Sequence, residues 1–74
     1  MIEAEFNLNL VHLTGHKRQT LDVGEPLSLA QLAARFGLTS DDVGMVLING
    51  AWAPPDSVIQ DGDRVQLYPF LEGG

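Results

Sequence analysis

The chain contains no cysteine. This absence excludes a disulfide framework, a thiolate metal site, and any nucleophilic or persulfide chemistry on a cysteine side chain. It agrees with a reducing compartment, and we expect a cytoplasmic protein. Positive charge is also scarce, because four basic residues stand against ten acidic ones and give a net charge of −6. That sign argues against nucleic-acid binding and favours a protein partner with a basic docking surface.

Long apolar runs are missing as well. No stretch approaches the length of a membrane span, and the N-terminus, with Glu3 and Glu5, does not have the pattern of a signal peptide. We therefore expect no membrane association. The 74 residues are enough for one domain with a single core, but leave no room for a deep active-site cleft. We do not expect the protein to be catalytic alone.

Apolar and polar residues alternate over residues 2–10, which predicts a half-buried strand with these residues inward: Ile2, Ala4, Phe6, Leu8 and Leu10. A turn over residues 14–17 and a returning strand over 19–23 would complete a hairpin. A helix is predicted next, because Ser28 and Gln31 have the spacing of a capping box and Gly37 is placed to end the helix in a Schellman motif. Its apolar stripe consists of Leu29, Leu32, Ala33 and Phe36.

The second half of the chain predicts three more strands. Residues 39–42 form a polar connection that could include one further helical turn, and residues 45–48 are an apolar run typical of a buried central strand. Asn49-Gly50 is a strong hairpin signal, so residues 51–53 should return as a short edge strand. Val58 and Ile59 should pack under a loop. After the turn at residues 61–63, the strand over 64–68 should point Val65 and Leu67 inward and Tyr68 outward.

This order of elements predicts an α+β protein with the β-grasp, or ubiquitin-like, fold. The mixed sheet would have about five strands, with one main helix packed on one face. A right-handed crossover through the helix would place the first and last strands side by side in the middle of the sheet. The domain would cover residues 1–70, and residues 71–74 would form a flexible tail that ends in Gly73-Gly74.

Several polar residues could be catalytic or metal-binding groups, but turn formation or helix capping is a sufficient role for most of them. His12 and His16, expected on a strand and a turn, lack further ligands nearby, so we predict no metal site. The aspartates at 41–42 and at 61 and 63 are explained by turn formation, since the second pair lacks the ligand count of a calcium loop. Ser28 has no adjacent base, and its capping role is sufficient.

The apolar residues outside the predicted core divide into two groups. Trp52 and Met45 could line a ligand pocket, but a single tryptophan in a small core is usually needed for packing, which we take as its role. The outward Tyr68 is followed closely by Phe70 and Leu71, and such an exposed patch beside a tail is typical of a docking site. A terminal glycine pair can be a frayed end, but it can also lie in a channel too narrow for other residues.

Four features together resemble the MoaD/ThiS family of ubiquitin-like sulfur carriers. They are the fold order, Ile48-Asn49-Gly50, Asp61-Gly62-Asp63, and the ending from Tyr68-Pro69 to Gly73-Gly74. The family includes the small subunit of molybdopterin synthase and the sulfur carrier of thiamine thiazole synthesis. The resemblance covers the whole chain and is most specific from Ile48 to Gly74.

The resemblance implies that an E1-like adenylyltransferase, using ATP and Mg²⁺, adenylates the Gly74 carboxylate. Sulfur from a persulfide donor then displaces AMP and leaves a thiocarboxylate, with no cofactor bound to the carrier itself. Tyr68-Pro69 is similar to the molybdopterin branch, whereas Phe70-Leu71-Glu72 departs from the small residues usual there. The expected sulfur acceptor is the molybdopterin synthase large subunit, with thiazole synthase, tRNA thiolation or protein modification as alternatives.

Overall fold

The structure is a computed structural model and describes residues 1–54 and 56–70. Neither helix in this part of the chain has the length and apolar character needed to cross a membrane. The predicted tail, residues 71–74, lies outside the described residues. The elements in chain order are β1 Ile2–Phe6, α1 Leu10–Thr14, β2 Arg18–Leu21, β3 Leu27–Ser28, α2 Leu29–Arg35, β4 Met45–Ile48, β5 Ala51–Trp52, β6 Val58–Ile59 and β7 Arg64–Tyr68.

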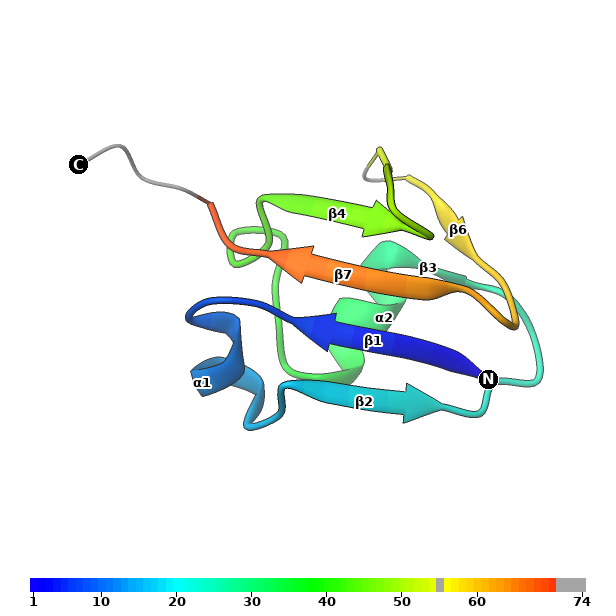
Figure 1. The fold of residues 1–74 in the computed structure, drawn as a ribbon, viewed down its shortest axis with the longest axis horizontal. Helices are drawn as coiled ribbons and strands as arrows, with labels where there is room; N and C mark the ends of the chain where they lie inside the picture. Colours follow the sequence, from blue (N-terminus) through cyan, green and yellow to red (C-terminus); the bar gives the residue numbers. More distant parts are fainter. Residues whose placement is uncertain (55, 71–74) are drawn as a thin grey trace.

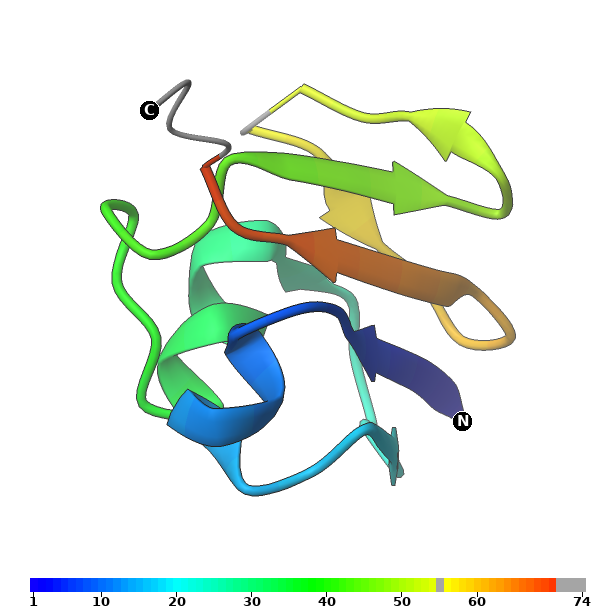
Figure 2. The same ribbon diagram turned by 60° about the vertical axis from the view of Figure 1, so that its left-hand side comes forward.

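Five strands form one mixed sheet in the order β2-β1-β7-β4-β5. β1 and β7 pair in parallel at its centre, and the other neighbours are antiparallel. The helix α2 packs on one face of the sheet, as both ribbon views show (Figures 1 and 2). This arrangement confirms the predicted β-grasp fold, including the adjacent first and last strands.

The core lies between the sheet and α2. The two central strands contribute alternate residues that are almost completely buried, with Ala4 paired opposite Val65 and Phe6 opposite Leu67. The helix contributes its apolar stripe, and the ring of Phe36 contacts that of Phe6 edge-on with the ring centres 4.7 Å apart. The inward residues of the strands and the apolar stripe of the helix thus form one buried cluster, as the alternation on the strands and the i, i+3, i+4 spacing on the helix predict.

Both ends of α2 have the predicted caps. The Ser28 hydroxyl accepts a hydrogen bond from the Gln31 N–H at 3.1 Å, and the Gln31 side chain accepts one from the Ser28 N–H at 3.0 Å. At the other end Gly37 is left-handed, with φ +76°. Its N–H donates to the Ala34 carbonyl, and the Leu38 N–H donates to the Ala33 carbonyl, which together make a Schellman motif.

The Asn49-Gly50 hairpin is confirmed, with positive φ at both residues, as a tight two-residue turn requires. It joins β4 to the two-residue edge strand β5. The expectation that β4 is fully buried is wrong, because Val46 is buried whereas Met45 is 39% exposed. The reason is that α2 covers only one face of the sheet, so alternate residues of an apolar run face outward on the other side.

The expectation of one strand from residue 2 to residue 10 is wrong after Phe6. The buried Asn7 donates from both its backbone and its side chain to the Leu67 carbonyl, and its side-chain oxygen accepts from Lys17. The chain then turns at Leu8, which has φ +55° and is 61% exposed. Leu10 is buried as expected, but from the short helix α1, which the left-handed Gly15 ends. The predicted hairpin of β1 and β2 therefore exists with a helix in its connection, and His12 lies on that helix.

A second, two-stranded sheet was not predicted. β3 pairs with β6 in antiparallel register, Leu27 opposite Ile59, and both of these residues are buried. The segment expected to pack under a loop is therefore a strand that fastens the start of α2 to the chain before β7. Each strand has two residues, which is too short for an alternation pattern to be read from the sequence.

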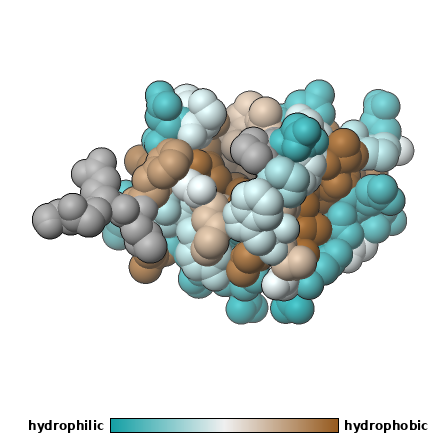
Figure 3. Space-filling view, turned by 90° about the horizontal axis from the view of Figure 1, so that it is seen from above, coloured by the Kyte–Doolittle hydropathy of each residue, from teal (hydrophilic) through white to brown (hydrophobic). Residues whose placement is uncertain are grey.

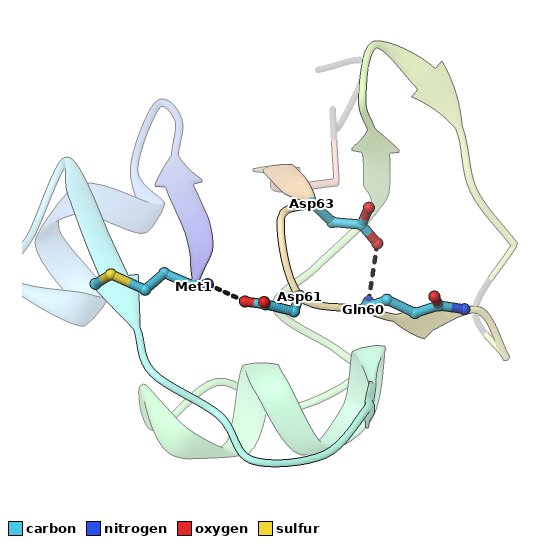
Figure 4. A network of polar contacts seen from close by, with 4 residues as sticks. All are labelled: Met1, Gln60, Asp61 and Asp63. Carbon is cyan, nitrogen blue, oxygen red and sulfur yellow. Dashed lines mark hydrogen bonds and ion pairs between the residues drawn. The ribbon is translucent and has the colours of Figure 1, made fainter.

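The turn over residues 60–63 joins the start of β1 to the start of β7 (Figure 4). The Asp61 carboxylate pairs with the Met1 ammonium group, and Asp63 accepts a hydrogen bond from the Gln60 N–H at 2.9 Å. Asp63 also accepts from the side chain of Asn49 at 2.9 Å. Asp63 thus has the turn contact that the sequence interpretation expected, whereas the contact of Asp61 is a long-range ion pair with the start of the chain.

Candidate functional site

The site predicted from the sequence lies where β7 ends and the tail begins. Of its residues, Tyr68 and Phe70 fall in the described part of the chain, whereas Leu71, Gly73 and Gly74 lie outside it. β7 ends at Tyr68, directly before Pro69, as predicted. Because β1 and β7 are parallel, their C-terminal ends lie at the same end of the sheet, next to α1 and the loop that precedes β4 (Figure 1).

The last two carbonyls of β7 are hydrogen-bonded from opposite sides. The Leu67 carbonyl accepts from the backbone N–H of Asn7 at 3.0 Å and from its side-chain amide at 3.2 Å. The Tyr68 carbonyl accepts from the Gly44 N–H at 2.8 Å, on the β4 side. The chain therefore leaves the sheet from a fixed point, which we call the tail root and define as residues 67–70.

Tyr68 lies on the sheet face opposite α2. Val65 and Leu67 point into the core, and the alternation of β7 puts Tyr68 on the other face. Its partner across the sheet is Met45, which is 39% exposed. Tyr68 itself is half-buried, so it presents part of its ring beside Met45. Phe70, one residue beyond Pro69, is 58% exposed.

An open groove of about 590 Å³ lies beside the tail root, between α2, the loop after it, and the β4–β5 edge. Its polar members are Thr39 and Ser40. Its principal apolar members are Leu29, Ala33, Val43, Met45, Trp52 and Phe70. Seen from above, one hydrophobic patch lies at the end of the molecule where β7 finishes, and further patches lie between hydrophilic residues across the face (Figure 3).

Trp52 corrects the sequence interpretation, which assigned this residue to core packing. It is 66% exposed, on an edge strand of two residues, and lines the groove together with Met45 and Phe70. The physical reason is its register: Trp52 pairs with Leu47, which alternates with the buried Val46, so Trp52 lies on the sheet face opposite α2. Three large apolar residues thus line one groove at the tail root, and such an exposed cluster is typical of an interaction surface.

The polar candidates do not assemble into a catalytic centre in the described residues. The Asp42 carboxylate accepts from the backbone and the hydroxyl of Thr39, which makes residues 39–42 a hydrogen-bonded turn without a further helical turn. His16 lies in the connection after α1, where its ring contacts the Gln19 amide at 2.8 Å. Over residues 1–54 and 56–70, no three histidine or acidic residues are grouped as metal ligands would be.

The comparisons with known proteins identify the family. The model of the ThiS family matches residues 4–74, and the chain therefore belongs to this family of ubiquitin-like sulfur carriers, as the resemblance implied. The match includes the tail and its terminal glycine pair. No curated protein matches the sequence.

Two solved structures share the fold. SAMP1 from Haloferax volcanii is 20% identical, with a TM-score of 0.70, and the alignment covers 99% of this chain and 98% of that one. Molybdopterin converting factor subunit 1 from Pyrococcus furiosus is 14% identical, with a TM-score of 0.72 and coverage of 95% and 97%. At these identities the likeness establishes the β-grasp fold.

We predict that Trp52→Ala changes the free energy of unfolding by only about 0.5 kcal/mol, because the indole is mostly exposed. Val65→Ala is the control, since it removes fewer atoms from a fully buried position and should destabilise more. Denaturant midpoints of both variants check this. A loss of about 3–5 kcal/mol for Trp52→Ala would be the mark of a core aromatic and would contradict the exposed position.

Proposed function

We propose that this protein carries sulfur as a thiocarboxylate on Gly74 and donates it in cofactor biosynthesis, most directly that of molybdopterin. The observation that carries the proposal is the family match over residues 4–74, which extends through the terminal glycine pair. The absence of cysteine supports it, because the side chains of this chain offer no thiol that could hold transferable sulfur. The terminal carboxylate is the group that remains.

The chemistry proposed at Gly74 has three steps. A carboxylate is a poor electrophile, so a carboxylate oxygen first attacks the α-phosphorus of ATP on an E1-like partner, and pyrophosphate leaves. The terminal sulfur of a persulfide then attacks the carbonyl carbon of the acyl adenylate, and AMP leaves. A thiol finally cleaves the resulting acyl disulfide, which gives the thiocarboxylate and a new disulfide. The partner enzymes supply the nucleotide, Mg²⁺, persulfide and thiol.

The carrier itself contributes a folded domain, a docking surface and a terminal segment that ends in two glycines. We propose that partners dock on the apolar surface formed by Met45, Trp52, Tyr68 and Phe70, which surrounds the tail root. Trp52 and Phe70 are exposed, and Tyr68 is half-buried. Aromatic residues and methionine are enriched at protein interfaces, and tryptophan and tyrosine are frequent among the residues that contribute most to binding. The net charge of −6 favours partners with basic surroundings and accelerates their encounter.

The proposed acceptor is the large subunit of a molybdopterin synthase. Tyr68-Pro69 before the tail and the fold shared with molybdopterin converting factor subunit 1 support it. The second candidate is donation to thiazole synthase in thiamine synthesis, which the match to the ThiS family model favours. Reconstitution with each acceptor and the thiocarboxylated protein distinguishes the two, because only the cognate synthase should consume the sulfur.

We predict that deleting Gly74 abolishes adenylation by the cognate E1-like enzyme while the melting temperature stays almost unchanged. The physical reason is that the reacting carboxylate is displaced by one residue, up to about 3.5 Å, whereas the core of the described residues is complete by Leu67. ATP–pyrophosphate exchange and thermal unfolding measure the two effects. A truncated protein that is adenylated at the wild-type rate would refute the role of Gly74.

We predict that Tyr68→Ala weakens binding to the E1-like enzyme by about 30-fold or more, because truncating an aromatic anchor costs about 2 kcal/mol. Val58→Ala is the matched control, since Val58 is an exposed apolar residue on β6, away from the tail root (Figure 1). Raising salt should slow association and leave dissociation nearly constant. Binding kinetics on the folded variants test this, and wild-type affinity for Tyr68→Ala would place the docking surface elsewhere.

A further inference from the structure

Gly44 lies in backbone contact with the tail root. Its N–H donates to the Tyr68 carbonyl at 2.8 Å, at the point where β7 ends. A Cβ added to Gly44 would lie 2.7 Å from the Phe70 Cα, 2.8 Å from the Phe70 nitrogen and 2.9 Å from the Pro69 oxygen. All three atoms are backbone atoms, so no side-chain rotation relieves the contact.

The need for glycine at this position is one of space and not of backbone conformation. Gly44 lacks the left-handed φ found at the four turn glycines, and a Cβ at any of these would meet nothing within 4 Å. Gly24 also lacks a left-handed φ and has free space around it. Gly44 is thus the one glycine of the described residues at which a side chain would collide with the protein.

The collision would displace Pro69 and Phe70, the last two residues of the tail root. Carbon atoms in contact are ordinarily about 3.5–4.0 Å apart, so a Cβ at 2.7 Å from the Phe70 Cα requires a shift on the order of 1 Å. The shift cannot be absorbed toward β1, because the Leu67 carbonyl is held by both N–H groups of Asn7. Pro69 adds its fixed φ just before the contact. The displacement therefore falls on the direction in which the chain leaves the sheet.

We propose that Gly44 is a positioning residue for Gly74: it sets the direction of the tail so that the terminal carboxylate reaches the nucleotide of a docked partner. This role rests on the proposed function. The four residues that follow Phe70, residues 71–74, can span at most about 14 Å, so the docked body and the tail root together limit where the carboxylate can lie. A misplacement of about 1 Å in a reacting group can cost on the order of 100-fold in rate.

The test is Gly44→Ala, with Gly24→Ala as the matched control that adds the same methyl group in free space. ATP–pyrophosphate exchange by the E1-like partner gives the maximal adenylation rate, and titration calorimetry gives the affinity. For Gly44→Ala we expect the maximal rate to fall by about 10- to 100-fold while Kd changes by less than about threefold. Gly24→Ala should match the wild type in both quantities.

Amide hydrogen exchange on the wild-type protein is the second measurement, and it does not depend on the variant's folding. The Gly44 N–H should be protected, because it is bonded to the Tyr68 carbonyl. Exchange of the Gly44 N–H at the rate of an unfolded chain would overturn the proposal. This measurement on the wild type can overturn it even if Gly44→Ala does not fold. Wild-type adenylation of Gly44→Ala, or equal losses in rate and affinity, would also overturn it. If the wild-type protein itself is not adenylated, the proposed function fails as well, so the two failures are distinguishable.

Discussion

The parallel pairing of β1 and β7 is the interaction on which the rest of the structure depends. It places the first and last strands at the centre of the sheet, where their inward residues form the middle of the core. Parallel strands cannot be joined by a tight turn, so the intervening chain must cross over, and α2 covers one face of the sheet as it does so. The same pairing brings the end of β7 beside Asn7, which holds the Leu67 carbonyl.

A terminal group that several enzymes must reach imposes two physical demands on its carrier. Under the proposed function, the end of the chain must be narrow and the point from which it departs must be rigid, because a partner that binds the body would then have the carboxylate within a fixed distance. The tail root meets the second demand through hydrogen bonds from Asn7 on one side and Gly44 on the other. Under the proposed function, the apolar groove beside it is the surface on which partners would align.

Features specified by neighbouring residues could be predicted from the sequence. The caps of α2 depend on Ser28, Gln31 and Gly37, all within one short segment, and the hairpin depends on Asn49-Gly50 alone. Alternation also placed Val65 and Leu67 in the core correctly. The fold followed, because these local elements permit few arrangements of the sheet.

Features that depend on distant contacts could not be predicted. The alternation of β1 continues past Phe6 in the sequence, but the chain turns at Leu8, directly after Asn7 has bonded to Leu67, sixty residues away. The exposure of Trp52 follows from its pairing with Leu47 on the sheet face opposite α2, and a two-residue strand is too short for the sequence to show which of its residues faces outward. The same holds for Gly44, whose contact with Phe70 exists only in the folded chain. At the candidate site, Tyr68 and Phe70 were named from the sequence, whereas the groove and Gly44 were found in the structure.

The central claim is that the Gly74 carboxylate becomes a thiocarboxylate, and the most direct measurement is the intact mass of the protein isolated from its native host. The account predicts a species heavier than the unmodified chain by the difference between one sulfur and one oxygen atom. Fragmentation should place that difference on Gly74, and alkylation of the sulfur should add one further group. A protein found only in its unmodified mass, in cells that are making the cofactor, would contradict the account. A ladder of higher-mass conjugates would contradict it in favour of a protein modifier.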